Sequence, residues 1–460
     1  MPSIVQQVYA QRGSVLNKQK TIEWFMKKAF DDQETAKAEP DAFLGHHHSL
    51  NLMLKEDFIH EATSRTVASL TTDAARLVTS APNPDGKQLE LWEKSGKVKF
   101  NDDGTFEADF FQLVINFMGQ IVTDNMWGKS LIQNFPTLQQ DLWDFDAGLH
   151  HLVTPLLSKI SPAGRRAVVA RETLNEAIRT WHEAVALKQA GKPYAAKWGA
   201  LDGVSGVLDK RVKMYEEHRA SAVLQRSNDV ALLWGVNVNS NKNVFWMLLQ
   251  IYSRATLLSD IREEIAPYVH ASLSGERTAS GFPKLDIDVD GLLKNCPLIK
   301  ATFYETMRLN MSNLGVREVL KDVVLRESEA DAKTFGKKHP QFYTIPAGAS
   351  IVLSNGTMQM DQRIFHDPEQ FIPERFIDEG PDGKPVVTMK SLNVFGGGLY
   401  RCKGRYFAEK EVIIFAASLL VMWDLAPVVG EQLVLPQMGI GGASRSPKKD
   451  IRVRLTRRFN

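Results

Sequence analysis

The most informative segment of the chain reads FGGGLYRCKGRYFA and runs from Phe395 to Ala408. Its three consecutive glycines permit tight turns and a close approach of the backbone to a flat group. Cys402 follows them at the start of an apolar helix, where the positive end of the helix dipole favours a thiolate. A thiolate is a soft metal ligand that can bind haem iron. An isolated cysteine after a glycine-rich loop is more often buried and inert, so the segment needs support from elsewhere in the chain.

Two charged patterns precede this segment. Glu305 and Arg308 are three residues apart, so they share one face of a helix. Arg375 lies in a Pro-Glu-Arg-Phe sequence that ends at Phe376. An acid and a base at this spacing usually form a solvated pair, whereas a buried arginine needs partners because its desolvation is costly.

Together the three patterns resemble the cytochrome P450 family. Phe395, Gly398, Cys402, Gly404 and Ala408 match the family's haem-ligand signature, F-x-x-G-x-x-x-C-x-G-x-x-x-A. The resemblance implies heme b (iron protoporphyrin IX) as the cofactor, with Cys402 as the axial thiolate and metal ligand. The other four positions would surround the cofactor.

The resemblance also bears on the basic residues of the site. Arg317 matches the family's basic residue that contacts a haem propionate. Tyr400 stands where the family often has a second basic residue, two positions before the cysteine. The neighbouring Arg401 is included among the expected cofactor-binding residues.

The implied fold is the cytochrome P450 fold, mainly α with small β-sheets (α+β). In it Glu305, Arg308 and Arg375 would form a buried charged triad that fixes the segment leading to the cysteine. A single haem-thiolate domain is expected over residues 1–460. Its β-rich part, haem-ligand loop and C-terminal helix would lie in residues 316–460.

The distal side of the haem is expected at the sequence Gly-Val-Asn-Val-Asn-Ser, residues 235–240. Most family members carry an acid followed by Thr here, whereas this chain has Val238 and Asn239. An amide donates and accepts hydrogen bonds but does not titrate. Asn239 and Ser240 are therefore the candidate catalytic residues, holding a water that relays protons. Other pocket walls would come, by resemblance, from residues 313–316 and 438–441.

Hydrophobic periodicity predicts a mostly helical chain with strands in its last third. Helices are expected at the N-terminus, around Ile4, Val5 and Val8, and over residues 21–30, 57–77, 106–121, 167–187, 228–254 and 412–423, the last as a buried core helix. Strands are expected over 316–325 and 350–354, with an exposed-edge strand over 451–455 and polar connectors over 82–104 and 275–283.

The resemblance does not include the beginning of the family fold. The membrane anchor, the first helix and the first strands are expected to be missing, and an upstream reading frame is expected to encode an apolar segment of about 20 residues. The location of this chain is therefore unknown from its sequence. The family usually resides on the endoplasmic reticulum membrane, so membrane association is implied by resemblance only.

Composition excludes several classes of protein. Hydrophobic residues make up 43% and charged residues 24%, as in ordinary globular proteins, which excludes global disorder. The net charge is +2, so no charge excess points to nucleic acid. Cys296, expected in the core or a loop, and Cys402 are too few for a disulfide framework. His46, His47 and His48 cannot all converge on one metal ion from a helix, so a polar loop or helix start is expected there.

The resemblance implies a haem-dependent monooxygenase that oxidises a small apolar substrate, sterol-, terpenoid-, polyketide- or alkaloid-like. Electrons would come from NADPH-cytochrome P450 reductase. The sequence of the chain resembles the branch of the family that contains sterol 7-alpha-hydroxylases and prostacyclin synthase. It also resembles fungal members that act in secondary metabolism. Three alternatives stay open: an isomerase that rearranges a peroxide substrate without dioxygen, a haem-free binding protein, and a thiol hydrolase using Cys402.

Overall fold

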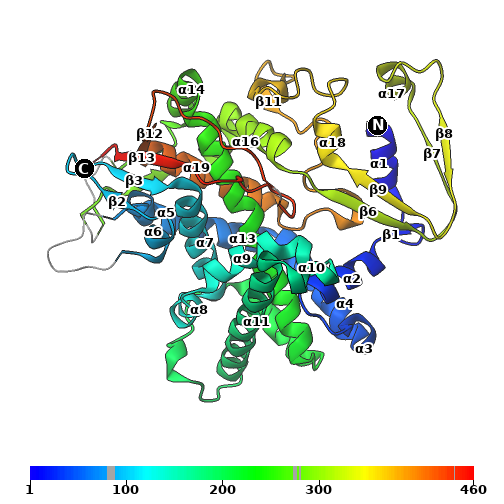
Figure 1. The fold of residues 1–460 in the computed structure, drawn as a ribbon, viewed down its shortest axis with the longest axis horizontal. Coiled ribbons are helices and arrows are strands. Elements are labelled where there is room, and N and C mark those ends of the chain that lie inside the picture. The colour runs from blue at the N-terminus through cyan, green and yellow to red at the C-terminus, as the bar shows by residue number, and fades with distance from the viewer. Residues whose placement is uncertain (80–88, 273–276, 279–280, 440, 460) are drawn as a thin grey trace.

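The computed structural model describes residues 1–79, 89–272, 277–278, 281–439 and 441–459, and helices dominate it (Figure 1). The α-helices in these residues are α1 (Pro2–Ala10), α2 (Gln19–Ala29), α3 (Thr35–Ala38), α4 (Pro40–Ser49), α5 (Glu56–Asp73), α6 (Leu91–Ser95), α7 (Phe110–Trp127), α8 (Ser130–Asn134), α9 (Leu138–Leu152), α10 (Pro155–Ile160), α11 (Pro162–Gln189), α12 (Gly206–Glu217), α13 (Ala222–Tyr252), α14 (Ala255–Ile265), α15 (Val289–Asn295), α16 (Pro297–Asn310), α17 (Glu329–Thr334), α18 (Asn355–Gln359) and α19 (Arg405–Met422). Short 3-10 helices are η1 (Leu50–Leu54), η2 (Ala74–Arg76), η3 (Ala196–Trp198), η4 (Pro373–Phe376) and η5 (Gly398–Tyr400).

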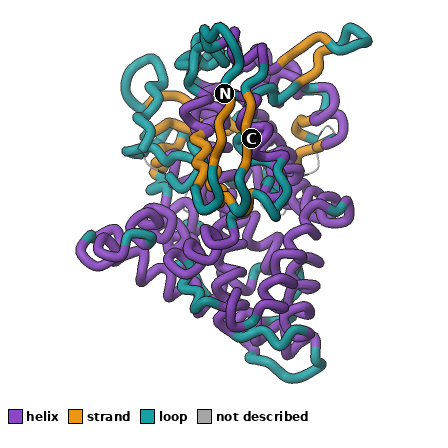
Figure 2. Tube along the Cα trace, turned by 90° about the vertical axis from the view of Figure 1, so that its right-hand side faces the viewer, coloured by secondary structure: helices purple, strands orange, loops and turns teal. Residues whose placement is uncertain are grey.

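The strands form small antiparallel sheets in the upper half of the view in Figure 2. They are β1 (Leu16–Asn17), β2 (Lys99–Phe100), β3 (Phe106–Asp109), β4 (Val269–Ala271), β5 (Leu285–Ile287), β6 (Leu314–Val319), β7 (Val323–Arg326), β8 (Phe342–Ile345), β9 (Ser350–Ser354), β10 (Ile377–Glu379), β11 (Pro385–Val387), β12 (Trp423–Pro427) and β13 (Arg452–Arg457). The two larger sheets have the orders β1-β6-β9 and β12-β13-β3-β2. Figure 1 shows β2, β3, β12 and β13 on the opposite side of the molecule from β1, β6 and β9. A mainly helical chain with small sheets confirms the expected fold class.

Helix α13 forms the centre of the helical part. Ser221 caps it by accepting a hydrogen bond from the backbone N–H of Leu224. Its second half is buried on nearly all sides, because α7, α9, α11, α16 and α19 pack around it. A helix surrounded in this way is fixed in position, so it provides a rigid wall for the cavity described below.

Three expectations for strands and helices were wrong in detail. Residues 106–109 form strand β3 rather than the start of a helix, and their burial alternates as a strand requires. The expected strand over 316–325 is two strands, β6 and β7, separated by a turn. Strand β13 is not at an edge, because it lies between β12 and β3 with Val453 and Leu455 buried. Sheet neighbours depend on distant segments, which local alternation does not reveal.

The expected connectors fall partly outside the described residues. Within 82–104, residues 82–88 lie outside them, and the rest includes α6 and β2. Within 275–283, only residues 277–278 and 281–283 are described. The expected helix over 412–423 begins earlier, at Arg405.

Helix α1 packs against the last third of the chain. Val5 and Val8 lie in a small apolar cluster with Val319, Leu325 and Leu353. The Ser3 hydroxyl donates to Asp331, and β1 pairs with β6. In Figure 1 the dark blue α1 lies beside the yellow β7–β8 hairpin. The N-terminal residues therefore take part in the site region.

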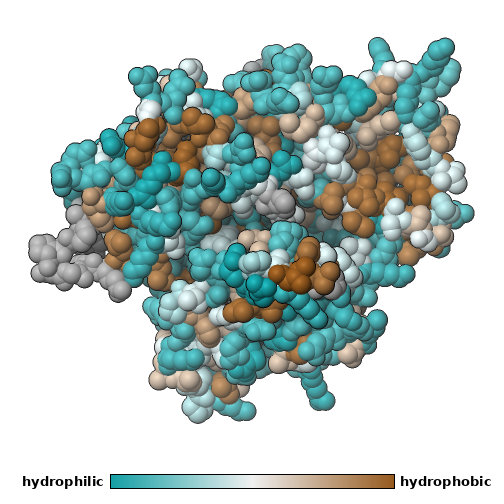
Figure 3. Space-filling view, in the orientation of Figure 1, coloured by the Kyte–Doolittle hydropathy of each residue, from teal (hydrophilic) through white to brown (hydrophobic). Residues whose placement is uncertain are grey.

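Figure 3 shows several apolar areas on the face drawn there, one of them over α10. Helix α10 exposes Leu156 and Ile160. No helix in the described part of the chain is long and apolar enough to cross a bilayer.

Candidate functional site

The loop before α19 folds back on itself to present Cys402. The backbone N–H of Cys402 donates to the carbonyl of Phe395 at 2.9 Å, which closes the loop. Gly396 and Gly398 have φ values of +67° and +64°, in the left-handed region that favours glycine. Two of the three consecutive glycines are therefore required by the turn that places Phe395 beside the cysteine.

Cys402 borders a cavity of about 380 Å³. One wall comes from the loop and α19, through Phe395, Cys402, Ala408 and Val412. The facing wall is α13, through Gly235, Asn239, Ser240 and Asn243. Further lining side chains come from other elements: Ile22, Phe25, Phe303, Met307, Met311, Leu314, Val316 and Ala443. The cavity therefore places the thiol opposite a helix that also carries polar side chains, within a largely apolar lining.

The Cys402 side chain is open to this cavity, yet protein surrounds it on the other sides. Burial raises the pKa of the thiol above its ordinary value. The backbone N–H groups of Gly404 and Arg405 and the charge of Arg405 act in the opposite direction. The helix end alone therefore does not supply the thiolate preference expected from the sequence.

Two cations, Lys18 and Arg317, line the cavity near the cysteine. Both lie 4.9 Å from the ring centre of Tyr400. Arg317 donates to the carbonyls of Val316 and Gly397, and the described residues provide no carboxylate for either cation. Burial and, to a lesser extent, the charge of Arg317 lower the pKa of Lys18 to about 8. Two neighbouring cations without an acid suit a ligand with carboxylates at this rim.

Tyr9 of α1 covers the glycine loop. A Cβ atom added at Gly397 would lie 2.2 Å from the Tyr9 ring, and one at Gly398 would lie 2.1 Å from the Tyr9 carbonyl oxygen. The Tyr9 ring also stacks on Arg317 at 5.4 Å. The close approach expected at these glycines is therefore made by α1.

The α13 wall has no titratable side chain that lines the cavity. Val238 is fully buried, and the Asn239 side-chain oxygen accepts a hydrogen bond from the backbone N–H of Ser444 at 3.0 Å. Near Ser240, Glu411 of α19 is a buried carboxyl group that no feature of the sequence had singled out, and burial raises its pKa to about 8. The two expected distal residues thus lie side by side at the cavity, and the backbone of Ser444 holds Asn239 in place.

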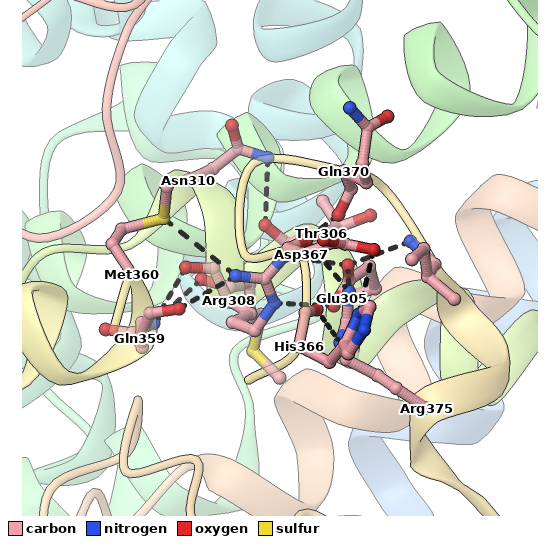
Figure 4. Close-up of polar contacts among 12 residues, drawn as sticks. Glu305, Thr306, Arg308, Asn310, Gln359, Met360, His366, Asp367, Gln370 and Arg375 are labelled. Atoms are coloured by element: carbon pink, nitrogen blue, oxygen red, sulfur yellow. Dashed lines mark hydrogen bonds and ion pairs between the residues drawn. The ribbon is translucent and has the colours of Figure 1, made fainter. Parts of the chain in front are cut away.

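Glu305 lies between two arginines beneath the loop that leads to the cysteine (Figure 4). Arg308 binds it through two hydrogen bonds of 2.7 and 2.8 Å, and Arg375 through one of 3.2 Å. The remaining donors of both arginines bind backbone carbonyls of Gln359, Gln370, His366 and Asp367. The structure therefore brings the three residues into one satisfied cluster that ties α16 to η4.

A sequence model described as "Cytochrome P450" matches residues 129–452, more than half of the chain and all of the motifs above. The chain belongs to the cytochrome P450 family. The match confirms the resemblance drawn from Phe395, Cys402 and Glu305.

Curated P450 relatives are similar over most of this chain at low identity. A cytochrome P450 monooxygenase of Gibberella zeae is 23% identical over 69% of this chain and 55% of its own length. Cytochrome P450 monooxygenase efuG of Hormonema carpetanum is 24% identical, over 69% and 58% respectively. Cytochrome P450 7A1 of Rattus norvegicus is 24% identical, over 78% and 66%. The chain thus spans little more than half the length of the two fungal relatives, and the expected likeness to fungal members and sterol hydroxylases is confirmed.

A solved P450 structure shares the fold. The retinoic acid-bound cyanobacterial CYP120A1 aligns with a TM-score of 0.62 at 16% identity, covering 98% of this chain and 87% of its own. At this identity the likeness concerns the fold alone.

Not all P450 cofactor contacts expected from the sequence line the cavity. Phe395, Cys402, Ala408 and Arg317 do, whereas Arg401 is exposed and does not. Arg401 follows η5 with an extended backbone, and the cation that stacks on Tyr400 beside Arg317 is Lys18 instead. Gly398 and Gly404 shape the loop: an added Cβ at Gly404 would meet Met53 at 3.3 Å.

One expected wall of the P450 pocket is also different. Residues 313–316 line the cavity, as expected. Met438 faces another hollow, Ile440 lies outside the described residues, and Ala443 takes the wall position. Ala443 is held there because its neighbour Ser444 bonds to Asn239.

The two remaining sequence features are structural. The three consecutive histidines lie inside helix α4, with His46 buried against Tyr215 and Arg211, and the described residues contain no cluster able to hold a metal ion. Cys296 is buried, and burial raises the pKa of its thiol to about 12.

Proposed function

We propose that the chain binds heme b in the cavity between Cys402 and α13 and acts as a haem-thiolate monooxygenase. The observation that carries the proposal is the cavity itself, with a thiol on one wall and Asn239 and Ser240 on the other. Bound haem would supply oxygen activation, with Cys402 as its ligand. The residues of the cavity fit heme b. The thiol can bind its iron, the apolar walls can contact its ring, and the two unpaired cations can pair with its carboxylates.

Each wall has a task in this proposal. Phe395, Ala408 and Val412 line the cavity, where they would pack against the ring and exclude water from it. Arg317 and Lys18 would hold the two carboxylates, so Lys18 would replace the basic residue absent at Tyr400. On the opposite wall, Asn239 and Ser240 order a water and pass protons into the cavity.

The proposed substrate is small and apolar. Phe25, Ile22, Val316 and Ala443 give the cavity apolar walls that favour such a ligand. The proposed substrate classes are sterols, terpenoids, polyketides and alkaloids, and one relative, of Cricetulus griseus, is named cholesterol 7-alpha-monooxygenase. Electrons would come from an NADPH-dependent reductase, as is usual in the family.

The same proposal treats residues 1–460 as one haem-thiolate domain, with the loop, the β-rich part and the C-terminal helix in residues 316–460. Contact with the endoplasmic reticulum membrane is proposed for two reasons. Members of the family usually reside on that membrane, and α10 exposes apolar side chains that could contact it.

A second candidate is rearrangement of a peroxide substrate without dioxygen. It is favoured by one observation: α13 places no titratable group on the cavity. Turnover under labelled dioxygen with reductase and NADPH, run beside an anaerobic assay with a peroxide substrate, separates the two. Label in the product supports monooxygenation, and turnover that needs neither dioxygen nor NADPH supports rearrangement.

The haem assignment is tested by the spectrum of the reduced, carbon-monoxide-bound protein. The wild type should show the thiolate-type Soret band, and Cys402→Ser should lose it. Cys296→Ser is the matched control and should keep it, because Cys296 is buried far from the cavity wall. A chain that takes up no haem would favour a haem-free binding protein, and an unchanged spectrum in Cys402→Ser would overturn the ligand assignment.

A further inference from the structure

Met311 borders two cavities: the one that contains Cys402 and a separate hollow of about 350 Å³. Arg254 lines this hollow from the start of α14, and Met438 and Arg445 line it from the segment before β13. Apart from Met311, the described residues that line the hollow differ from those of the first cavity. A hollow of this volume can hold one small ligand, so it is a candidate site in its own right.

Arg254 lines the hollow without a carboxylate partner. Its Nη1 atom donates to the backbone and side-chain oxygens of Gln250 at 3.0 and 2.6 Å and to the Ser253 hydroxyl at 2.9 Å, and its guanidinium stacks on Phe371 at 4.9 Å. No ion pair in the described part of the chain includes it. Burial lowers the pKa of Arg254, and the charge of Glu305 opposes that shift, although Glu305 is already bound to two other arginines.

Arg445 is the second cation at the hollow. Its backbone N–H donates to the carbonyl of Asn310 at 2.9 Å, and its own carbonyl accepts from the Trp246 indole at 2.8 Å. These bonds hold its backbone between α16 and α13. Within the described residues its side chain has no ion pair, and its one hydrogen bond is a 3.9 Å contact with the sulfur of Met438. A partly buried guanidinium without an acid is costly unless a ligand pairs with it.

The charges around the hollow favour a monoanion. Arg308 also lines it, but Glu305 and two backbone carbonyls already occupy that guanidinium. Glu369 is the acid among the described residues of the lining, and it is exposed. Two unpaired arginines and one acid leave an excess of one positive charge. Guanidinium groups bind carboxylates through parallel N–H donors, so a single carboxylate matches this excess.

The rest of the lining is mostly apolar, and half of its apolar side chains are methionines. Methionine is flexible and polarisable, so it adapts to apolar ligands of different shapes. Met360 lies beside Arg308 in Figure 4, with its sulfur 3.9 Å from Nη1. A hydrocarbon chain would therefore find apolar contacts directly next to the cations. The apolar side chains are Leu309, Met311, Met360, Phe371, Leu435 and Met438.

We propose that this hollow is a second ligand site, which binds an amphiphilic monocarboxylate with one apolar chain. Arg254 and Arg445 pair with the carboxylate, and the methionines and Phe371 contact the chain. The volume suits a single hydrocarbon chain rather than the two chains of a phospholipid. The inference goes beyond the proposed function and does not depend on it, because Met311 is the one described residue that the hollow shares with the first cavity.

The first test is isothermal titration calorimetry of dodecanoate, below its micelle concentration, into the full chain. The wild type should bind dodecanoate, and Arg445→Gln should bind it about tenfold more weakly or worse, because a charged hydrogen bond is lost. Arg262→Gln is the matched control and should keep the affinity, because Arg262 is also partly buried but lies outside the hollow and is paired with Asp424. A wild type that binds no dodecanoate, or an unchanged affinity in Arg445→Gln, overturns the proposal.

A second arginine variant shows which cavity holds the acid. Arg317 is the unpaired arginine of the first cavity and does not line the hollow. A loss of affinity in Arg445→Gln without a loss in Arg317→Gln places dodecanoate in the hollow. A loss confined to Arg317→Gln places it in the first cavity and overturns the proposal.

The second test varies the ligand. Dodecanol has the same chain without the charge, and acetate has the carboxylate without the chain. Each should bind the wild type about tenfold more weakly than dodecanoate, or worse, and Arg254→Gln should remove most of the preference for dodecanoate over dodecanol. Dodecanol or acetate binding as tightly as dodecanoate overturns the proposal, because the arginines or the apolar wall would then have no part in binding. If Arg254→Gln fails to fold after losing its bonds to Gln250 and Ser253, the comparison with Arg445→Gln still decides.

Discussion

Arg308 and Arg317 are both buried, yet their surroundings differ. Arg308 has Glu305 and two backbone carbonyls as partners, and every direction of its guanidinium is occupied. Arg317 has backbone carbonyls and two aromatic rings but no acid among the described residues, and Lys18 stands nearby. A fully paired buried charge stabilises the fold, whereas an unpaired buried charge at a cavity is available to bind a ligand.

Breaking the paired arginine should have the largest effect. Arg308→Ala leaves Glu305 buried with Arg375 as its remaining cation, which should lower the free energy of unfolding by about 3–5 kcal/mol. Urea unfolding followed by circular dichroism measures it. Arg363→Ala is the control, because its pair with Asp361 is exposed and should cost at most about 1 kcal/mol. If both variants lost the same free energy of unfolding, the triad would stabilise the protein no more than an exposed ion pair does.

Removing the unpaired arginine should weaken haem binding and leave the fold largely intact. Arg317→Gln should change the unfolding free energy of the haem-free chain by about 1 kcal/mol or less, while the lost charged hydrogen bond speeds haem dissociation about 10- to 100-fold. Haem transfer to apomyoglobin measures that rate. Arg326→Gln, at an exposed position at the end of β7, should change neither quantity. A destabilisation as large as that of Arg308→Ala would erase the distinction between the two arginines.

Replacing Lys18 should have the smallest effect, a change in how the stability of the protein depends on pH. The pKa of Lys18 in the folded chain, about 8, lies below its ordinary value of 10.5, so the unfolded chain binds more protons between these two pH values. Stability of the haem-free chain should therefore rise as pH increases from about 8 to 10.5, and Lys18→Gln should flatten that rise. Lys20→Gln, two residues away and exposed, should keep it. Thermal unfolding at several pH values measures this dependence. If Lys18 had an acidic partner, stability would fall rather than rise with increasing pH.

The sequence located the cysteine and the triad because each is a local pattern. The spacing around Cys402 and the three-residue step from Glu305 to Arg308 can be read within a single segment. Lys18 was missed because it becomes a site residue only when α2 meets Tyr400, almost four hundred residues later. No local pattern distinguishes it from the exposed Lys20.

Glu411 could have been found. In the sequence, Glu411 directly precedes the apolar run of residues 412–423, over which a buried core helix is predicted. The helix begins at Arg405 instead, so Glu411 lies inside it and is buried. An acid that precedes an apolar run by less than one turn, with the helix starting earlier, is a signal worth testing for burial.

The packing of α1 has a consequence for the order of synthesis. Gly397 and Gly398, the neighbours of Tyr9 in the fold, are synthesised almost four hundred residues after it. At about 5–20 residues per second, roughly 20–80 s separate the two events. During that interval α1 has none of its β7, β6 or loop contacts. The pocket is therefore completed only when α1 meets segments that are synthesised long after it.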